Sequence, residues 1–183
     1  MCSYHCRALK LQFLLNLIVI IELFQSSNAM KALIQRVANA SVTVNEEVIS
    51  SINRGLCVLI GIHRDDKESD IEFIVRKLLN LRLFESTDGS GRKWNSNVVE
   101  NGYEILCVSQ FTLYHTLKGN KPDFHHAMSP SAAEPFYNQF LSCLRTEYEE
   151  SKIKDGKFGA LMQVNLVNDG PVTLEIESPP TKN

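Results

Sequence analysis

The segment between Gly55 and Gly61 constrains the fold most, because the five residues at 56–60 are all apolar. A run of this length between glycines is typical of a strand that is buried on both faces. The pattern then changes over 68–81, where Ile71, Ile74 and Leu78 recur at spacings of three and four. That spacing predicts an amphipathic helix. The two segments together predict a domain that combines sheet and helix.

The remaining patterns predict more strands and a second helix. Alternating or β-rich segments lie at 32–37, 40–44, 48–52, 81–85, 103–113, 160–167 and 172–176, with turns at 45–46, 88–91 and 168–171. The second helix is expected to begin near Ser131, where Ser131 and Glu134 form a capping box, and to continue to about Glu149. Residues 114–124 are expected to form a polar loop. The predicted fold class is α+β: a single compact domain with mixed, mostly antiparallel sheets or an open barrel, and two helices.

Charge and cysteine content restrict the function classes. The chain of 183 residues carries 19 basic and 21 acidic residues, a net charge of −2, so it has no global positive field to attract nucleic acid. A nucleic-acid ligand would need a local basic patch. The five cysteines are widely spaced and include no CxxC pair, which favours reduced thiols over a disulfide framework or a zinc site. Cys57 and Cys107 lie inside apolar runs, where a thiol is usually a small core side chain.

Residues 1–29 differ from the rest of the chain. Arg7 and Lys10 precede a mostly apolar stretch at 11–24, and small residues follow up to Ala29, which resembles a secretory signal peptide. The stretch is too short and too often interrupted by polar residues to span a bilayer. The alternative is an upstream extension of a chain whose natural start is Met30. The sequence leaves both interpretations open, and we divide it into this extension and one domain at 30–183.

Conventional catalytic motifs are absent from the sequence. It contains no HExxH, GxSxG, P-loop or GxGxxG pattern. His63 is expected in a solvated loop, and the adjacent side chains of His125 and His126 point apart in any regular structure. We therefore expect neither a metal nor a cofactor. An enzyme with this sequence has to work without a recognisable triad.

Three polar segments lie at strand ends or between the expected strands. They are Ser-Gln-Phe-Thr-Leu at 109–113, Lys-Gly-Asn-Lys-Pro-Asp-Phe at 118–124 and Asn-Asp-Gly-Pro-Val-Thr at 168–173. Each has a plain structural interpretation: a strand end with hydroxyl groups, a mobile solvated loop, and a turn favoured by glycine and proline. None of the three is specific when taken alone.

Taken in order, these segments resemble the D-aminoacyl-tRNA deacylase family, the eukaryotic and bacterial type. The matching segments are SQFTL at 109–113, KGNKPDF at 118–124, KDGKFGA at 154–160 and NDGPVT at 168–173. The opening at 30–44 is similar to the start of that family, so the resemblance covers 30–183, whereas residues 1–29 have no counterpart. It implies an enzyme that hydrolyses the ester bond of D-aminoacyl-tRNAs, and of glycine mischarged on tRNA, as a proofreading step in translation. The expected location is the cytoplasm, with the nucleus as an additional candidate.

The resemblance also implies a homodimer in which each active site lies across the subunit interface. Gly170 and Pro171 would form a cis peptide and reach into the pocket of the partner subunit. There their fixed backbone would exclude L side chains and admit D-aminoacyl groups and glycine. Arg36 would support this backbone, because a cis peptide has to be held by its surroundings.

The pocket itself is expected to be lined by Ser109, Gln110, Phe111 and Thr112, with Thr173 near the ester. Backbone N–H groups around Phe111 and Thr112 would form an oxyanion hole. The 2′-OH of the terminal adenosine of the tRNA would assist the attack, so that the substrate supplies what a catalytic base usually does. The contribution of the protein would then be positioning.

The expected partner is the 3′ end of an aminoacyl-tRNA. Lys118, Lys121, Lys154 and Lys157 are candidates for phosphate contacts, and Phe124 for stacking on the adenine. A non-enzymatic DNA-binding protein of the same fold is the alternative, less favoured because the chain is acidic overall. A secreted binding module that uses residues 1–29 as a signal is the other alternative. No association with a membrane is expected.

Overall fold

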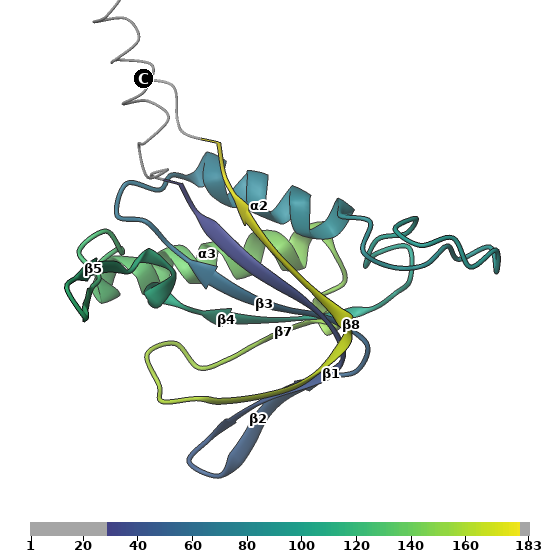
Figure 1. Ribbon diagram of the computed structural model, residues 1–183, viewed down its shortest axis with the longest axis horizontal. Helices are drawn as coiled ribbons and strands as arrows, with labels where there is room; N and C mark the ends of the chain where they lie inside the picture. Colours follow the sequence, from purple (N-terminus) through teal and green to yellow (C-terminus); the bar gives the residue numbers. More distant parts are fainter. Residues whose placement is uncertain (1–28, 180–183) are drawn as a thin grey trace, which may run out of the picture.

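A computed structural model describes residues 29–179 and shows a curved sheet with two helices on one side (Figure 1). Strands β3 and β2 pair with successive parts of one edge of β1, and β8 pairs with the opposite edge. On the far side of β3, β4 and then β7 continue the sheet. Their bounds are β1 Lys31–Val44, β2 Glu47–Ile52, β3 Gly55–Gly61, β4 Glu104–Ser109, β7 Ile153–Asp155 and β8 Gln163–Glu177. A separate hairpin consists of β5 Thr116–Lys118 and β6 Lys121–Asp123. The β3–β4 and β4–β7 pairs are parallel and the others antiparallel, so the predicted fold class is confirmed.

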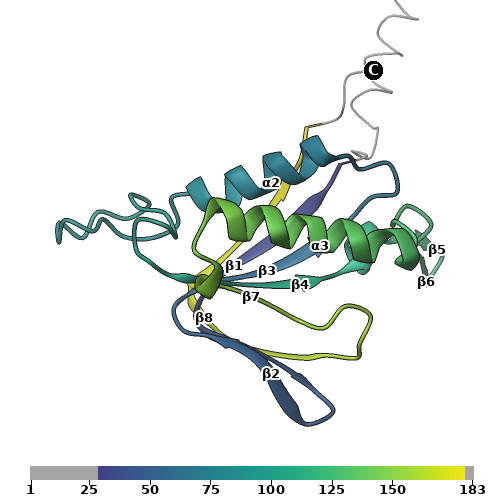
Figure 2. The ribbon, with the colours of Figure 1, turned by 180° about the vertical axis from the view of Figure 1, so that it is seen from behind.

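Helices α2 (Glu68–Asn80) and α3 (Pro130–Glu147) lie side by side over one face of the sheet (Figure 2). The three- and four-residue spacing of α2 places Ile74 and Leu78 against the sheet, and both are fully buried. Phe140 and Leu144 of α3 pack in the same core. Within residues 29–179, no helix is long and apolar enough to cross a membrane.

A second, smaller core lies on the opposite face of the sheet. It contains Val37 and Val42 of β1, Cys57 of β3 and Leu106 of β4. Alternate residues of one strand face opposite sides, so the continuous apolar run of β3 supplies both cores. Burial raises the pKa of the Cys57 thiol to about 11, as expected for a core side chain rather than a reactive one. The three cysteines in the described part of the chain carry free thiols.

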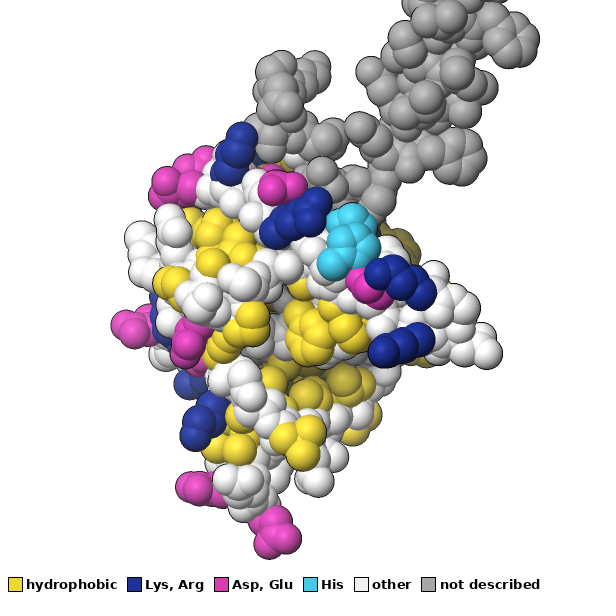
Figure 3. Space-filling model, turned by 90° about the vertical axis from the view of Figure 1, so that its left-hand side faces the viewer, with side chains coloured by type: hydrophobic (Ala, Val, Ile, Leu, Met, Phe, Trp, Pro, Cys, Tyr) yellow, Lys and Arg dark blue, Asp and Glu magenta, His cyan; other side chains and the backbone are white. Residues whose placement is uncertain are grey.

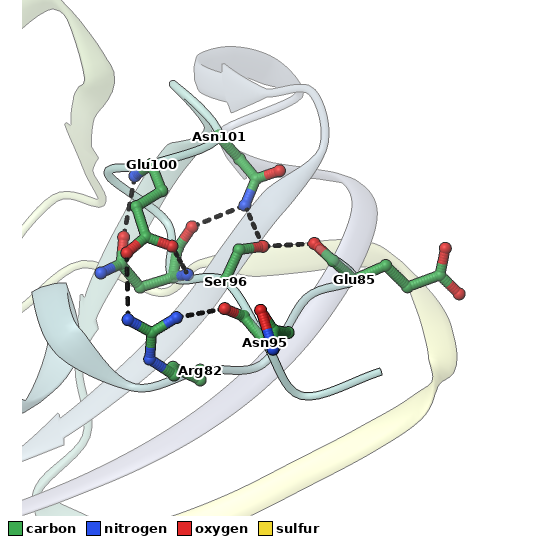
Figure 4. A network of polar contacts seen from close by, with 7 residues as sticks. Arg82, Glu85, Asn95, Ser96, Glu100 and Asn101 are labelled. Atoms are coloured by element: carbon green, nitrogen blue, oxygen red, sulfur yellow. Dashed lines mark hydrogen bonds and ion pairs between the residues drawn. The ribbon is translucent and has the colours of Figure 1, made fainter. Parts of the chain in front are cut away.

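The structure corrects the expected strand at 81–85. This segment is not a strand; it forms a single bridge between Phe84 and Ser96, with both residues buried. Backbone groups of residues 95 and 96 bond with Phe84, and Figure 4 shows side chains that bind a carbonyl of the segment and a carbonyl of the following loop. The Ser96 hydroxyl donates to the Glu85 carbonyl, and the Arg82 guanidinium binds the Asn95 carbonyl and, at 3.3 Å, the Glu100 carboxylate.

Two further boundaries differ from the sequence prediction. The strand expected at 103–113 ends at Ser109, because the chain turns into a 3₁₀ helix at Phe111–Tyr114. Helix α3 begins at Pro130 with Ser129 as its N-cap, so the capping box predicted at Ser131 is not the start of the helix. Proline suits the first helical position, where its missing N–H costs nothing.

The turn expected at 168–171 is also wrong. The chain continues as one strand, β8, through these residues. It includes the predicted strand at 172–176 and residues 163–167 of the one predicted at 160–167. Likewise β1 joins the two segments predicted at 32–37 and 40–44. The polar loop at 114–124 contains the β5–β6 hairpin, and β7 was missed because a strand of three residues has too few positions to show a period.

Gly55 supplies a test of the sheet. A Cβ at this buried position would overlap the Glu104 carbonyl oxygen on the adjacent strand. Gly55→Ala should therefore lower the free energy of unfolding by about 3 kcal/mol or more, measured by chemical denaturation. Gly102→Ala is the matched control. Its φ is +63° and open space surrounds it, so it should cost only about 1–2 kcal/mol. Equal losses would show that β3 and β4 are not packed this closely.

Candidate active site

A pocket of about 680 Å³ opens beside the C-terminal ends of β3 and β4. It is enclosed by four parts of the chain: the end of β3, the β4–3₁₀ junction, the loop that leads into α3, and residues 158–164. Most of its lining is apolar, and the lining residues are Ile60, Ile62, Val108, Ser109, Gln110, Phe111, Phe124, Ala127, Met128, Ser129, Pro130, Ala133, Phe158, Gly159, Ala160, Leu161, Met162 and Val164. Figure 3 faces the side of the molecule on which β5 lies, where apolar side chains gather at the centre with basic side chains beside them.

The polar side of the pocket is the turn that ends β4. Ser109, Gln110 and Phe111 line it. The Gln110 N–H donates to the Ile60 carbonyl at 2.7 Å, which ends the strand, and the Gln110 side-chain amide donates to the Thr112 hydroxyl. Thr112 thus lies behind the lining rather than in it. Phe111 and Thr112 are the first residues of the 3₁₀ helix, and neither N–H donates to any acceptor in the described residues.

Phe124 forms the aromatic edge of the pocket. Its ring packs edge-on against Phe111, with 5.0 Å between the ring centroids. The β5–β6 hairpin that leads to Phe124 is held by an ion pair between Lys118 and Asp123. The hydrogen bond from Lys118, with a second one from His125, holds the pKa of the Asp123 carboxyl well below its usual range. The Asp123 carboxyl is therefore ionised throughout the neutral pH range, as the ion pair with Lys118 requires.

The candidate tRNA-binding lysines lie near two edges of the pocket. Lys118 and Lys121 are exposed on the hairpin next to Phe124. Lys154 lies in β7 and is half-buried, whereas Lys157 is exposed directly before the lining residue Phe158. This distribution leaves the pocket apolar and its surroundings basic.

Among the residues that line the pocket, none carries an ionisable side chain. Three histidines adjoin lining residues in the sequence: His63 follows Ile62, His125 follows Phe124, and His126 precedes Ala127. His63 is buried, which corrects the expectation of a solvated loop. Burial also lowers the pKa of His63. Within residues 29–179, no three His, Cys, Asp or Glu side chains are grouped so that they could hold a metal ion. The pocket therefore offers backbone groups, one amide and hydroxyls, but no acid or base.

Gly170 and Pro171 lie elsewhere, in a bulge of β8. Arg36 pairs with Val172 and the next residue of β1, Val37, pairs with Asn168, so that residues 169–171 have no partner across the ladder. Gly170 has a φ of +117°, which L residues rarely adopt. No cis peptide bond occurs in residues 29–179, so the expected cis Gly170–Pro171 bond is wrong here. Proline has no backbone N–H to donate, and the bulge tolerates this because its residues make no ladder hydrogen bonds. The Gly170–Pro171 bond has the ordinary trans form.

Arg36 anchors the bulge through its guanidinium group. Its Nε donates to the Asp169 carbonyl at 3.0 Å, and its Nη1 donates to the Leu83 carbonyl. The Trp94 ring covers the guanidinium, with 5.8 Å from Cζ to the ring centroid. A second arginine, Arg54, binds the Asp169 carboxylate at 3.0 Å. Sequence reasoning identified Arg36 but missed Arg54 and Trp94, because no local pattern shows that these residues meet at one bulge.

The structure does not bring the two halves of the predicted site together within one chain. The residues that line the pocket include Val164, at the start of β8, but not Gly170, Pro171 or Thr173 farther along the same strand. Gly170, Pro171 and Thr173 are all exposed.

The chain is similar to known proteins over nearly all of the described residues. Residues 33–177 match the family described as D-Tyr-tRNA(Tyr) deacylase. A human protein named D-aminoacyl-tRNA deacylase 1 is 61% identical over 150 residues, which cover 82% of this chain and 71% of the human one. The chain belongs to the D-Tyr-tRNA(Tyr) deacylase family. A Drosophila melanogaster member named D-aminoacyl-tRNA deacylase is 56% identical over 154 residues, 84% of this chain and 96% of that one.

Solved structures share the deacylase-family fold. One described as "c-Myc DNA Unwinding Element Binding Protein" is 60% identical, with a TM-score of 0.78 over 81% of this chain and 99% of that one. Another, described as "Structural Analysis of a probable eukaryotic D-amino acid tRNA deacylase", reaches a TM-score of 0.72 at 19% identity, over 82% of this chain and all of that one. The second likeness shows the fold alone.

The two arginines at the bulge should differ in their effect on stability. Arg36→Gln leaves the Asp169 and Leu83 carbonyls without their donors in a half-buried site, so it should lower the free energy of unfolding by about 1–3 kcal/mol. Arg54→Gln removes an exposed contact to the same Asp169 and should cost at most about 1 kcal/mol. Hydrogen exchange at 167–172 should quicken in the first variant. Unchanged exchange there would show that Arg36 does not hold the bulge.

Proposed function

We propose that this member of the family hydrolyses the ester bond of D-aminoacyl-tRNAs, and of glycine mischarged on tRNA, to free tRNA and amino acid. The observation that carries the proposal is the apolar pocket without an ionisable lining residue, next to two N–H groups that have no acceptor in the described residues. Membership in the deacylase family supports the same reaction. Removal of D-aminoacyl groups would be a proofreading step in translation, which favours a cytoplasmic location.

The reaction needs charge stabilisation more than it needs a base. As water attacks the ester carbonyl, negative charge develops on its oxygen, and the N–H groups of Phe111 and Thr112 would donate to that oxyanion. Donors of this kind are typically worth about 10²–10³ in rate each. The 2′-OH of the terminal adenosine would assist the proton transfer, since the lining residues supply no general base. Ser109, Gln110 and Thr112 would position the substrate, because the Gln110–Thr112 hydrogen bond fixes the turn.

The selection of D-aminoacyl groups would come from a second subunit. Gly170 and Pro171 are exposed on a bulge that is anchored by Arg36, yet they are not among the residues that line the pocket of their own chain. In a homodimer the bulge of one subunit would reach the pocket of the other. There the carbonyl groups of Gly170 and Pro171 would face the α-carbon and exclude an L side chain by steric overlap, with Thr173 near the ester.

The exposed surface of β8 supports the homodimer. Val167 is 53% exposed and Leu174 38%, while Leu161, just before the strand, is 93% exposed. A strand of 15 residues with one unpaired edge and exposed apolar side chains is typical of an interaction surface. A second copy of the chain would cover it and complete two sites at once.

The tRNA end would be bound by the rim of the pocket. Phe124 would stack on the adenine of the terminal adenosine. Lys118, Lys121, Lys154 and Lys157 would contact phosphates of the acceptor stem, which makes binding dependent on salt concentration. The ion pair of Lys118 with Asp123 fixes the position of one of these charges in advance.

The direct test compares the two enantiomers of one substrate. The full chain is incubated with D-Tyr-tRNA and with L-Tyr-tRNA, and the loss of the ester is followed over time. We expect rapid hydrolysis of the D form and at least a hundredfold slower hydrolysis of the L form, about 2.7 kcal/mol of discrimination. Hydrolysis of both forms would leave an esterase but discard the backbone filter. Hydrolysis of neither would contradict the proposed reaction.

Site variants separate the filter from the chemistry. Pro171→Ala should narrow the difference between enantiomers, whereas Thr112→Ala should slow the D reaction without admitting the L form. Gly170→Ala would place a Cβ 2.8 Å from Arg36 Nη2, so it should both narrow the difference between enantiomers and slow the D reaction. Gly89→Ala is the control. The φ of Gly89, +75°, is similarly unfavourable for alanine, but open space surrounds this residue and it does not line the pocket. Unchanged rates in all three site variants would contradict the site assignment.

DNA binding is the second candidate function. It is favoured by one observation, the 60% identical solved structure described as a c-Myc DNA unwinding element binding protein. The overall acidic charge of this chain counts against it. Salt-sensitive binding to duplex DNA without ester hydrolysis would favour this function over the deacylase reaction.

The homodimer can be tested through β8. Val167→Lys places a charge on the exposed apolar surface and should raise the dimer dissociation constant at least about tenfold, with loss of activity at protein concentrations below it. Val99→Lys is the matched control because Val99 is 41% exposed on a loop outside the sheet. Sedimentation or light scattering gives the oligomeric state. A wild-type chain that is a fully active monomer would rule out a site shared between subunits.

A further inference from the structure

The start of β1 is enclosed by the fold. Ala29 and Met30 are fully buried although they precede the first strand residue, Lys31. The Met30 carbonyl accepts the Ser178 N–H at 2.9 Å, and the Ala29 carbonyl accepts the Tyr114 hydroxyl. Because Lys31 pairs with Gly61, the register places Ala29 and Met30 beside residues 62 and 63, which follow β3.

Two carboxylates lie at this same end of the sheet, the half-buried one of Asp66 and the buried one of Asp70. Asp66 Oδ2 accepts the His63 N–H at 2.6 Å, but its Oδ1 is buried without a hydrogen-bond partner. Asp70 is 4% exposed, and its oxygens accept the Ser178 hydroxyl at 2.6 Å and the Lys67 N–H at 2.8 Å. The ion pairs of the described residues include neither carboxylate, although a buried charge is normally paired.

The surrounding charged groups do not supply the missing cation. From β1, Lys31 is paired with Glu175 at 3.5 Å and with Glu177 at 2.6 Å, both on β8. From the loop after β3, His63 has a lowered pKa and Asp65 adds negative charge. Tyr114 faces the carboxylates from the 3₁₀ helix, and its pKa is raised by burial and by Asp66.

Asp66 reflects this surplus of negative charge. Burial raises the pKa of its carboxyl to about 7, with further increases from Asp70 and Asp65, against the hydrogen bond from His63. A proton would thus occupy Asp66 near neutral pH unless a cation joins the cluster. The backbone nitrogen of Met30 lies at this end of the fold, since the Ala29 carbonyl of its peptide unit accepts from Tyr114 and the Met30 carbonyl accepts from Ser178, whose hydroxyl donates to Asp70.

We propose that the working form of the chain begins at Met30, and that its free α-ammonium group binds the carboxylates of Asp66 and Asp70. Without Ala29, the Tyr114 hydroxyl loses its carbonyl acceptor and becomes free to donate to Asp66 Oδ1. The ammonium group brings three donors and one positive charge to two carboxylates. The site is thus completed by the loss of residues 1–29.

Two routes produce the same ammonium group. A peptidase can hydrolyse the Ala29–Met30 bond: water supplies OH to the Ala29 carbonyl carbon and hydrogen to the Met30 nitrogen, which is protonated at neutral pH. Translation that starts at Met30 yields the same terminus without cleavage, provided that the amine is not acetylated. Both routes predict the same folded chain.

The first experiment measures the titration of Asp66 by ¹³C NMR in chains that begin at residues 1, 29 and 30. The shortest chain is a sound choice, because it keeps all of residues 33–177, which match the family. In the chain that begins at Met30, the pKa of Asp66 should lie at least about one unit lower than in the other two. The chain that begins at Ala29 is the matched control, since its ammonium group lies one residue away. Equal pKa values in all three would overturn the proposal.

The pH dependence of stability gives an independent readout. A carboxyl with a raised folded-state pKa stabilises the fold when protonated, so the full chain should lose stability as pH rises from about 4 to about 7. The chain that begins at Met30 should lose this dependence, and N-terminal acetylation should restore it. Asp66→Asn should remove the dependence from the full chain. A decline of the same size in every chain would contradict pairing with the ammonium group.

The terminus made in cells distinguishes the two routes. The full reading frame is expressed with Met30 or with Met30→Leu, and the N-terminus of the product is determined by mass spectrometry. If both reading frames yield a product that begins at residue 30, a peptidase has cleaved the chain. If only the frame with Met30 yields it, translation has started at Met30. Either result supports the proposal. A product that always begins upstream of residue 30 would overturn it.

Discussion

The pairing of β1 on both edges is the constraint on which the rest of the structure depends. One strand of 14 residues forms ladders with β3 and β2 on one edge and with β8 on the other. Its two halves face different cores, since Ala32 and Ile34 belong to the core under the helices and Val37 and Val42 to the smaller one. The shift of register in β8 opposite Arg36 and Val37 falls where the strand passes from one core to the other. The bulge at 169–171 is therefore a consequence of how the sheet curves.

This origin explains why the bulge can act as a rigid element. A loop of three unpaired residues would normally be mobile, but here both flanks are held in the β1–β8 ladder. Arg36 then fixes the Asp169 carbonyl, and the Trp94 ring covers the guanidinium. A filter that acts by steric exclusion needs a backbone that does not yield, because a shift of about 1 Å admits the wrong substrate or misplaces the right one. The sheet supplies that stiffness without a catalytic side chain.

Local patterns in the sequence predicted those elements whose apolar residues follow a regular pattern over many positions. The period of α2 and the apolar run of β3 each extend over enough residues to be recognised, and both are present in the structure. The segment at 81–85 has the composition of a strand but bonds with side chains of its own loop, which no period shows. The pocket residues Ser109, Gln110 and Phe111 could be named because family motifs contain them. Arg54 could not, since its meeting with Asp169 depends on the global pairing of β1 with β8.

An apolar pocket and a filter made of backbone form a consistent chemical design. An ionisable base inside the pocket would activate water against any ester that entered, L or D, and selectivity would then depend on binding alone. With the proton transfer assigned to the 2′-OH of the substrate, reaction requires that the ester be placed against the N–H groups of Phe111 and Thr112. Placement is the quantity that a fixed carbonyl near the α-carbon can control. Under the proposed function, selection and catalysis would become one geometric condition, which would be met only when a second subunit contributes its bulge.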